Sequence, residues 1–317
     1  NLLNIEKIQM IISFLPVLFN QLFNVLTKNN DDDYVFKTQS YEDRTVHEEL
    51  SKGITSLLKC NDLNTIKLVL KHSQFLFDII IKSMAQHLHD KDMMQVHRTK
   101  RFPTTFHAEL EALVMSFSDH IIWKYKDALE ETKKANLSIA CFLKCCFTFM
   151  DRGFVFKMVS SCISMFSPGD GKILHQYKFE FLQEVCSHEH FVPLCLPLRS
   201  SDIPDPLTPS DSTKVYHALD MPEYTLTDDF CRKHFLIGIL LREVGLALQE
   251  DQDIRHLALT ALKNIMAKHS FDNRYSDKEK QAQIAVLFLP LYGILLDNMP
   301  RIFMKDFFPF TVNTSNQ

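Results

Sequence analysis

Cysteine and histidine are the residues of this chain that could support the largest number of reactions. Either side chain can bind a metal or transfer a proton, and cysteine is also a nucleophile. The 317 residues include 8 cysteines and 14 histidines. Three groups come closest to a metal-binding pattern: Cys231 with His234, the histidines at 188 and 190, and the cysteines at 141, 145 and 146. A structural zinc site needs four converging ligands. Further ligands do not follow at a recognisable spacing, so the sequence predicts no metal and no other cofactor.

Motifs for phosphate binding and nucleophilic catalysis are also missing. The nearest match to a phosphate-binding loop is Gly171-Lys172, with Phe166 where the first glycine belongs and Ile173 in place of serine or threonine. The sequence contains no G-x-S-x-G elbow. A cysteine and a histidine can always be paired in a chain this rich in both, so such a pair carries no information. The sequence therefore predicts that this segment is not an enzyme.

The cysteines fall mostly within apolar helical stretches and form no C-x-x-C pair. This distribution is typical of buried free thiols in a reducing compartment, which favours a cytoplasmic protein. In that setting the two N-x-[ST] sequences, at Asn136 and Asn313, have no expected role.

Two short polar segments are the candidate contact sites. Residues 97–101 form the one local basic cluster, and Arg98, Lys100 and Arg101 would suit an acidic partner or an anionic lipid head group. The alternative interpretation is a solvated loop. Thr208, which precedes a proline, is a candidate for proline-directed phosphorylation, as is Ser167.

Composition predicts a helical protein. Only 7 glycines are present, whereas sandwiches and doubly wound sheets use glycine at frequent turns. The formal net charge of -4 provides no general positive field, so we expect no nucleic-acid partner. The longest apolar run covers residues 285–296 and contains Pro290, which is too short to span a membrane.

Apolar residues recur at helical spacing almost throughout the chain. Sequences that resemble capping boxes at 225–228 and 276–279 mark two of the helix starts. With mostly short turns, this pattern predicts an all-α fold, an irregular α-solenoid of armadillo or HEAT type with about ten to eleven helices. The segments are about 8–26 with a kink at Pro16, 43–58, 62–88, 103–121, 136–149, 152–166, 170–186, 226–248, 254–265 and 282–296.

Residues 191–222 differ from the rest of the chain because they hold six of the 12 prolines. An extended loop of this length is unusual inside a compact domain but is tolerated as an insertion on one face of a solenoid. We therefore expect residues 1–317 to form a single helical array with an inserted proline-rich loop at 191–222. Both ends of the sequence suggest a piece of a longer chain, which remains an expectation.

Several stretches, in their order along the chain, resemble one family. From about residue 62 onward the sequence is similar to the middle region of the Dock (dedicator of cytokinesis) guanine-nucleotide exchange factors, and most similar to the zizimin, or Dock-D, subfamily. The stretches that carry the resemblance are 77–86, 150–156, 177–183, 188–194, 234–243, 267–275 and 284–291.

The resemblance implies a large cytosolic protein that activates Rho-family GTPases by releasing GDP. In that family the exchange reaction belongs to the second Dock homology region, and lipid binding to a pleckstrin homology domain and the first Dock homology region. This segment would be the helical scaffold between them, with dimerisation or autoinhibition as further roles. Membrane recruitment would come from the other domains. The alternative is a solenoid that itself binds a peptide or an active GTPase.

Overall fold

The computed structural model describes residues 45–60, 62–197 and 224–302. Within these ranges the chain forms 13 α-helices, a few 3-10 turns and no strand. The helices are α2 (Val46–Leu58), α3 (Leu63–Lys71), α4 (Ser73–Asp90), α5 (Thr104–Lys124), α6 (Leu129–Phe149), α7 (Arg152–Ser164), α8 (Lys172–Val185), α9 (Phe191–Cys195), α10 (Asp228–Lys233), α11 (Phe235–Ala247), α12 (Gln252–Ser270), α13 (Lys278–Leu287) and α14 (Pro290–Ile302).

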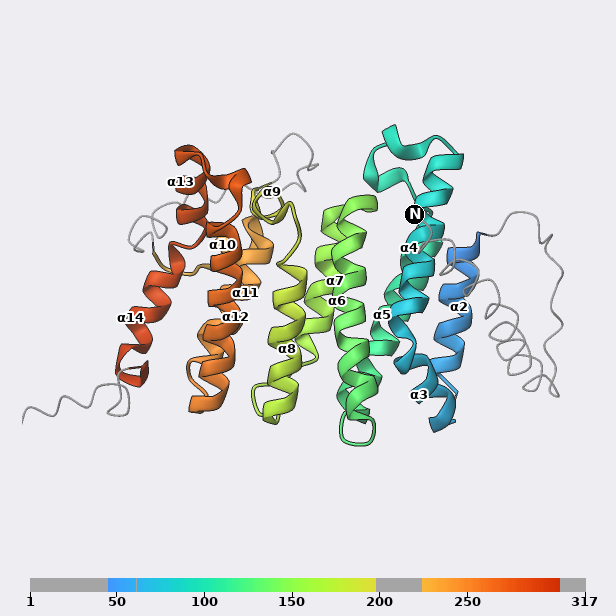
Figure 1. The fold of residues 1–317 in the computed structure, drawn as a ribbon, viewed down its shortest axis with the longest axis horizontal. Coiled ribbons are helices and arrows are strands. Elements are labelled where there is room, and N and C mark those ends of the chain that lie inside the picture. The colour runs from blue at the N-terminus through green and yellow to red at the C-terminus, as the bar shows by residue number, and fades with distance from the viewer. Residues whose placement is uncertain (1–44, 61, 198–223, 303–317) are drawn as a thin grey trace, which may run out of the picture.

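The long helices stack side by side in two layers (Figure 1). One layer contains α2, α5, α7, α11 and α14 in that order, and the other contains α4, α6, α8 and α12. Each long helix contacts the next helix of its own layer, and α5 and α7 of one layer also contact α6 of the other, which is the arrangement of a solenoid. The prediction of an all-α solenoid is confirmed.

The structure has more helices than predicted because three predicted helices are each broken in two. The segment 62–88 is divided at His72, where the backbone leaves the helical region (φ -101°, ψ 12°). Both halves pack on α6, and the buried Ser73 hydroxyl donates to the Ser138 hydroxyl at 3.0 Å just after the break. The prediction of one helix over 62–88 was therefore wrong, because the apolar residues of this segment are buried by two helices that meet at a break. The predicted helix at 8–26 lies outside the described residues.

The other two breaks occur at His234 and before Pro290. His234 leaves the helical region (φ -119°, ψ 59°), and its Nδ1 lies 2.7 Å from the Cys195 carbonyl oxygen. Pro290 has no N–H to continue a helix, and α13 and α14 meet at a bend of 45°. This bent pair could span a membrane by length and composition alone, and no single helix in the described residues could. The caps also differ from the prediction by one or two residues, since Thr227 and Asp277 cap α10 and α13.

The predicted proline-rich loop begins too early. Residues 191–195 form the short helix α9, and Phe191 and Cys195 are fully buried. Arg152 holds this helix in place, since its guanidinium donates to the Leu196 carbonyl at 3.1 Å. Apolar side chains at 191, 192 and 194 therefore override the helix-breaking tendency of Pro193. Residues 198–222 of the predicted loop lie outside the described residues.

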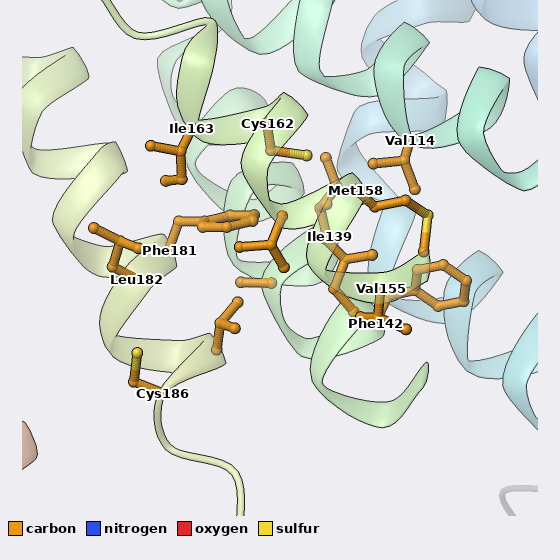
Figure 2. Close-up of a cluster of buried hydrophobic side chains, with 14 of the residues drawn as sticks. Val114, Ile139, Phe142, Val155, Met158, Cys162, Ile163, Phe181, Leu182 and Cys186 are labelled. Atoms are coloured by element: carbon orange, nitrogen blue, oxygen red, sulfur yellow. The ribbon is translucent and has the colours of Figure 1, made fainter. Parts of the chain in front are cut away.

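A continuous apolar core lies between the layers. Phe77 stacks on Phe142 with ring centroids 4.5 Å apart and contacts Phe117 at 4.9 Å, which joins α4, α5 and α6. Figure 2 shows how α5, α6, α7 and α8 interlock around the next part of this core, whose labelled residues are Val114, Ile139, Phe142, Val155, Met158, Cys162, Ile163, Phe181, Leu182 and Cys186.

The cysteines are all free, as the sequence predicts, but they are not all buried. Four are buried, three are partly exposed and Cys145 is exposed. Burial raises the pKa of Cys162 to about 11 and that of Cys186 to about 12. These two thiols stay protonated at neutral pH and act as packing groups.

Candidate functional site

The basic connector between α4 and α5 faces the end of α6. The Arg98 guanidinium donates to the Phe147 carbonyl at 3.1 Å, and Arg101 donates to the Phe149 carbonyl at 3.3 Å. Arg101 also donates to the carbonyls of Met94, at 2.7 Å, and of Val96, at 3.0 Å. Carbonyls in the last turn of a helix lack partners within the helix, so the two arginines cap the C-terminus of α6.

The three predicted contact residues differ in how far they are exposed to solvent. Arg101 is buried, and burial lowers the pKa of its guanidinium, with the nearby charge of Arg98 acting in the same direction. Lys100 is exposed. The structure thus uses Arg98 and Arg101 within the fold. Binding of a partner by this cluster stays a prediction, and Lys100 is the residue best exposed to make such a contact.

Replacing Arg101 with alanine is expected to lower the free energy of unfolding by about 2 kcal/mol, because three carbonyls lose a charged donor. Urea unfolding followed by circular dichroism measures this loss. The matched control is Lys100→Ala, expected to change stability by less than about 0.5 kcal/mol. Equal losses from the two variants would contradict a capping role for Arg101.

The other sequence candidates are spread over the fold. Thr208 lies outside the described residues, and Ser167 lies in the exposed turn between α7 and α8. His188 uses Nδ1 to accept the backbone N–H of His190 at 2.9 Å. The Cys141 thiol donates to Glu184, which also pairs with Lys144. In the described part of the chain, no three His, Cys, Asp or Glu side chains converge as metal ligands would.

A groove that sequence analysis missed lies where α7, α10, α11 and α14 approach one another. It consists of two adjoining depressions of about 460 and 320 Å³, and both are lined by Asp228, Cys231 and Arg242. Ser160 of α7 lines the first depression, and Ile294 of α14 lines the second. Because its walls come from residues more than 130 positions apart, no local sequence pattern could have revealed it.

Charged and apolar groups alternate along this groove. The Arg242 guanidinium pairs with Asp228 at 2.8 Å, and both side chains remain at least half exposed. Burial raises the pKa of the Cys231 thiol, although the charge of Arg242 opposes the shift. The neutral thiol and the paired arginine suit recognition of a peptide better than nucleophilic chemistry.

Comparison with known proteins identifies the array. A family model described as the TPR domain of DOCK6-11 matches residues 32–186. Human dedicator of cytokinesis protein 9 is 44% identical over 337 aligned residues, which cover 95% of this chain. The chain belongs to the Dock family. Zebrafish (Danio rerio) dedicator of cytokinesis protein 11 is 37% identical over 343 residues, again covering 95% of this chain.

The degree of identity places the chain within the family. Human dedicator of cytokinesis protein 7 is 31% identical over 255 residues, which cover 74% of this chain and 12% of the relative. The higher identities to proteins 9 and 11 confirm the resemblance to the Dock-D subfamily. The chain spans only 16% of the length of those two Dock proteins. No solved structure matches the chain.

The family model and the sequence prediction assign the helical repeats to different classes. The model describes the region as a TPR domain, whereas the sequence suggested armadillo or HEAT repeats. Both classes stack helices in two layers into a solenoid, as observed here.

Proposed function

We propose that this segment is a non-catalytic helical scaffold within a guanine-nucleotide exchange factor for Rho-family GTPases. It spaces and orients the lipid-binding and exchange domains of the longer protein. The observation that carries this proposal is the stack from α2 to α14, in which successive long helices of each layer pack on one another. Such a stack holds its two ends at a defined separation and angle, because each unit is fixed by its neighbours.

Polar contacts between helices that are neighbours in the stack but not in the sequence support a rigid spacer. Lys144 on α6 pairs with Glu184 on α8, and Asn264 on α12 donates to Gln183 at 3.1 Å. Lys172 at the start of α8 pairs with Asp253 of α12 at 2.6 Å. These contacts lie across helix junctions, where they oppose sliding of one unit over the next.

Nucleotide exchange tests the non-catalytic part of the proposal. The chain is mixed with Rho-family GTPases loaded with fluorescent GDP, and GDP release is followed with excess GTP. We expect the release rate to equal the spontaneous rate, whereas an exchange domain from a Dock protein, as positive control, accelerates it. Acceleration by the chain alone would rule the proposal out.

We further propose that the array contributes to dimerisation or to autoinhibition. Analytical ultracentrifugation tests dimerisation, and adding the array to an isolated Dock exchange domain tests inhibition. A monomer at micromolar concentration that leaves the exchange rate unchanged would contradict both roles. We also propose that the longer protein is cytoplasmic and reaches membranes through its other domains. Fractionation of cells measures this distribution.

The groove favours a second candidate function, a solenoid that binds a peptide or an active GTPase directly. Its volume and mixed lining are of the kind that accepts an extended segment. Pull-down with GTP-loaded against GDP-loaded GTPases distinguishes this role from spacing alone. Arg242→Glu is expected to abolish capture, whereas Lys263→Glu, on an exposed position of α12, leaves it unchanged.

A further inference from the structure

One side of the array, where several helices end, exposes an aromatic side chain near lysines. Trp123, the one tryptophan in the chain, lies in the last turn of α5 and is 76% exposed. Leu129, which begins α6, is also exposed. Apolar surface exposed to water costs free energy, which is recovered when a partner covers it.

Seven lysines come from the elements that meet on this side. Contacts bring the elements together: His120 Nε2 lies 2.7 Å from the Leu58 carbonyl oxygen, and α3 packs on α6. With Trp123 and Leu129 they form what we call the lysine–tryptophan edge, and its lysines are Lys59, Lys67, Lys71, Lys124, Lys126, Lys133 and Lys134.

Positive charge prevails at this edge although carboxylates are present. The five carboxylates are Asp62, Asp119, Asp127, Glu130 and Glu131. Three of them have local roles, since Asp62 caps α3 and both glutamates lie in the first turn of α6, where they offset the helix dipole. The pKa of His72 is lowered, mainly by burial and then by the charges of Lys71 and Lys134, which agrees with a positive potential there.

The same side of the array is acidic further along. The turns that precede α8 and α12 lie beside each other at the lower ends of the helices in Figure 1, joined by the pair of Lys172 with Asp253. Their other charged residues are Asp170, Glu250 and Asp251, together with Arg255, whose guanidinium donates to the Glu250 carbonyl at 2.8 Å. The charge on this side is thus polarised, basic below α3, α5 and α6 and acidic below α8 and α12.

The position of the edge decides what can cover it. Further units of a solenoid stack on its end faces, whereas the last turns of α2 and α5 and the start of α6 lie along a side that stacking leaves open. Tryptophan and lysine together are the residues of membrane–water interfaces, where the indole ring reaches the head-group level and lysines attract anionic lipids. We propose that the lysine–tryptophan edge binds the surface of membranes that contain anionic phospholipids, with Trp123 inserted among the head groups.

This proposal goes beyond spacing, because the scaffold would itself orient the longer protein on a membrane. The basic half of the side would lie on the lipid, and the acidic half would be repelled from it. Neither apolar contact nor charge alone gives stable peripheral binding, but the two together do. The edge supplies both.

Trp123 makes the test direct, because the emission of the chain reports on this one indole ring. The 317-residue chain is titrated with vesicles of phosphatidylcholine mixed with phosphatidylserine, and with vesicles of phosphatidylcholine alone. We expect a blue shift of the emission and protection from acrylamide quenching with the anionic vesicles only. High salt should reverse both effects, because it screens the lysines.

Vesicle co-sedimentation of variants completes the test. Lys124→Glu with Lys126→Glu is expected to reduce partitioning by at least about 25-fold, since each lysine near an anionic surface contributes about fivefold. Trp123→Ala should reduce it several-fold. The matched controls are Phe271→Ala, an 85% exposed aromatic residue elsewhere, and Lys263→Glu, and both should bind as the unmodified chain does.

Three results would overturn the proposal. The first is an emission that stays unchanged with anionic vesicles at low salt, and the second is equal loss of binding in the control variants. The third is a blue shift produced by polyglutamate but not by vesicles, which would assign the edge to an acidic protein instead.

Discussion

Replacing Lys178 with methionine is expected to lower the free energy of unfolding by about 3 to 5 kcal/mol. Lys178 on α8 pairs with Glu243 on α11 at 2.8 Å, and the two side chains are only 5% and 12% exposed. Methionine retains the length of the side chain but leaves the Glu243 carboxylate buried without its counter-charge. The cost of that uncompensated charge greatly exceeds the loss of the contact itself. Urea unfolding followed by circular dichroism measures the difference.

A double variant separates the charge from the packing. Lys178→Met combined with Glu243→Leu removes both charges, and we expect it to recover most of the lost stability, since an apolar pair can replace a buried ion pair. The matched control is Lys172→Met, which breaks the exposed pair with Asp253 and is expected to cost less than about 1 kcal/mol. A double variant no more stable than the single one would show that the pair is not an isolated buried charge pair.

Mild acid is expected to destabilise the array through three buried histidines. His47, His188 and His269 each have a pKa lowered to about 4, with burial as the largest cause. The unfolded chain has histidine pKa values near 6.5 and so binds more protons than the folded chain between pH 6.5 and pH 4. The stability from the neutral rings is thus fully present above pH 6.5 and is lost as the pH falls towards 4.

The expected loss between pH 7 and pH 5 is at most about 2 kcal/mol per histidine. It is measured as the free energy of unfolding in urea at half-unit steps of pH. His269→Phe tests the assignment, because phenylalanine can keep the parallel stack on Phe191, with ring centroids at 4.6 Å, yet cannot titrate. This variant should lose about a third of the pH dependence. A pH profile unchanged by His269→Phe would refute the assignment.

The helical class could be predicted from sequence because it depends on local spacing. Apolar residues three and four positions apart define a buried helix face wherever they occur, and the observed α5, α7 and α8 begin and end close to the predicted limits. Family membership could also be predicted, since it rests on the order of short sequence stretches. The predicted segment 62–88 also begins at the observed place, because Asp62 precedes an apolar run and its side chain caps α3.

The breaks within helices could not be predicted in the same way. His72 and His234 have no strong tendency to end a helix. The break at His72 lets both α3 and α4 pack on α2 and α6, whereas the break at His234 separates α10 from α11, which packs on α7, α9, α12 and α14. The short helix α9 shows the opposite case, in which burial of Phe191 stabilises a helical turn despite Pro193. Tertiary packing outweighs local propensity at these positions.

The candidate sites show the same division. Sequence alone determined an all-α solenoid of the Dock family and pointed to its basic connector, because composition, spacing and local charge are properties of neighbouring residues. Only the tertiary structure decided that Arg101 caps α6, that Asp228 and Arg242 share a groove, and that Trp123 lies near lysines from three helices and two connecting turns. The physical reason is that capping, grooves and surface potential depend on distances between atoms far apart in sequence, which only the packing of the helices fixes.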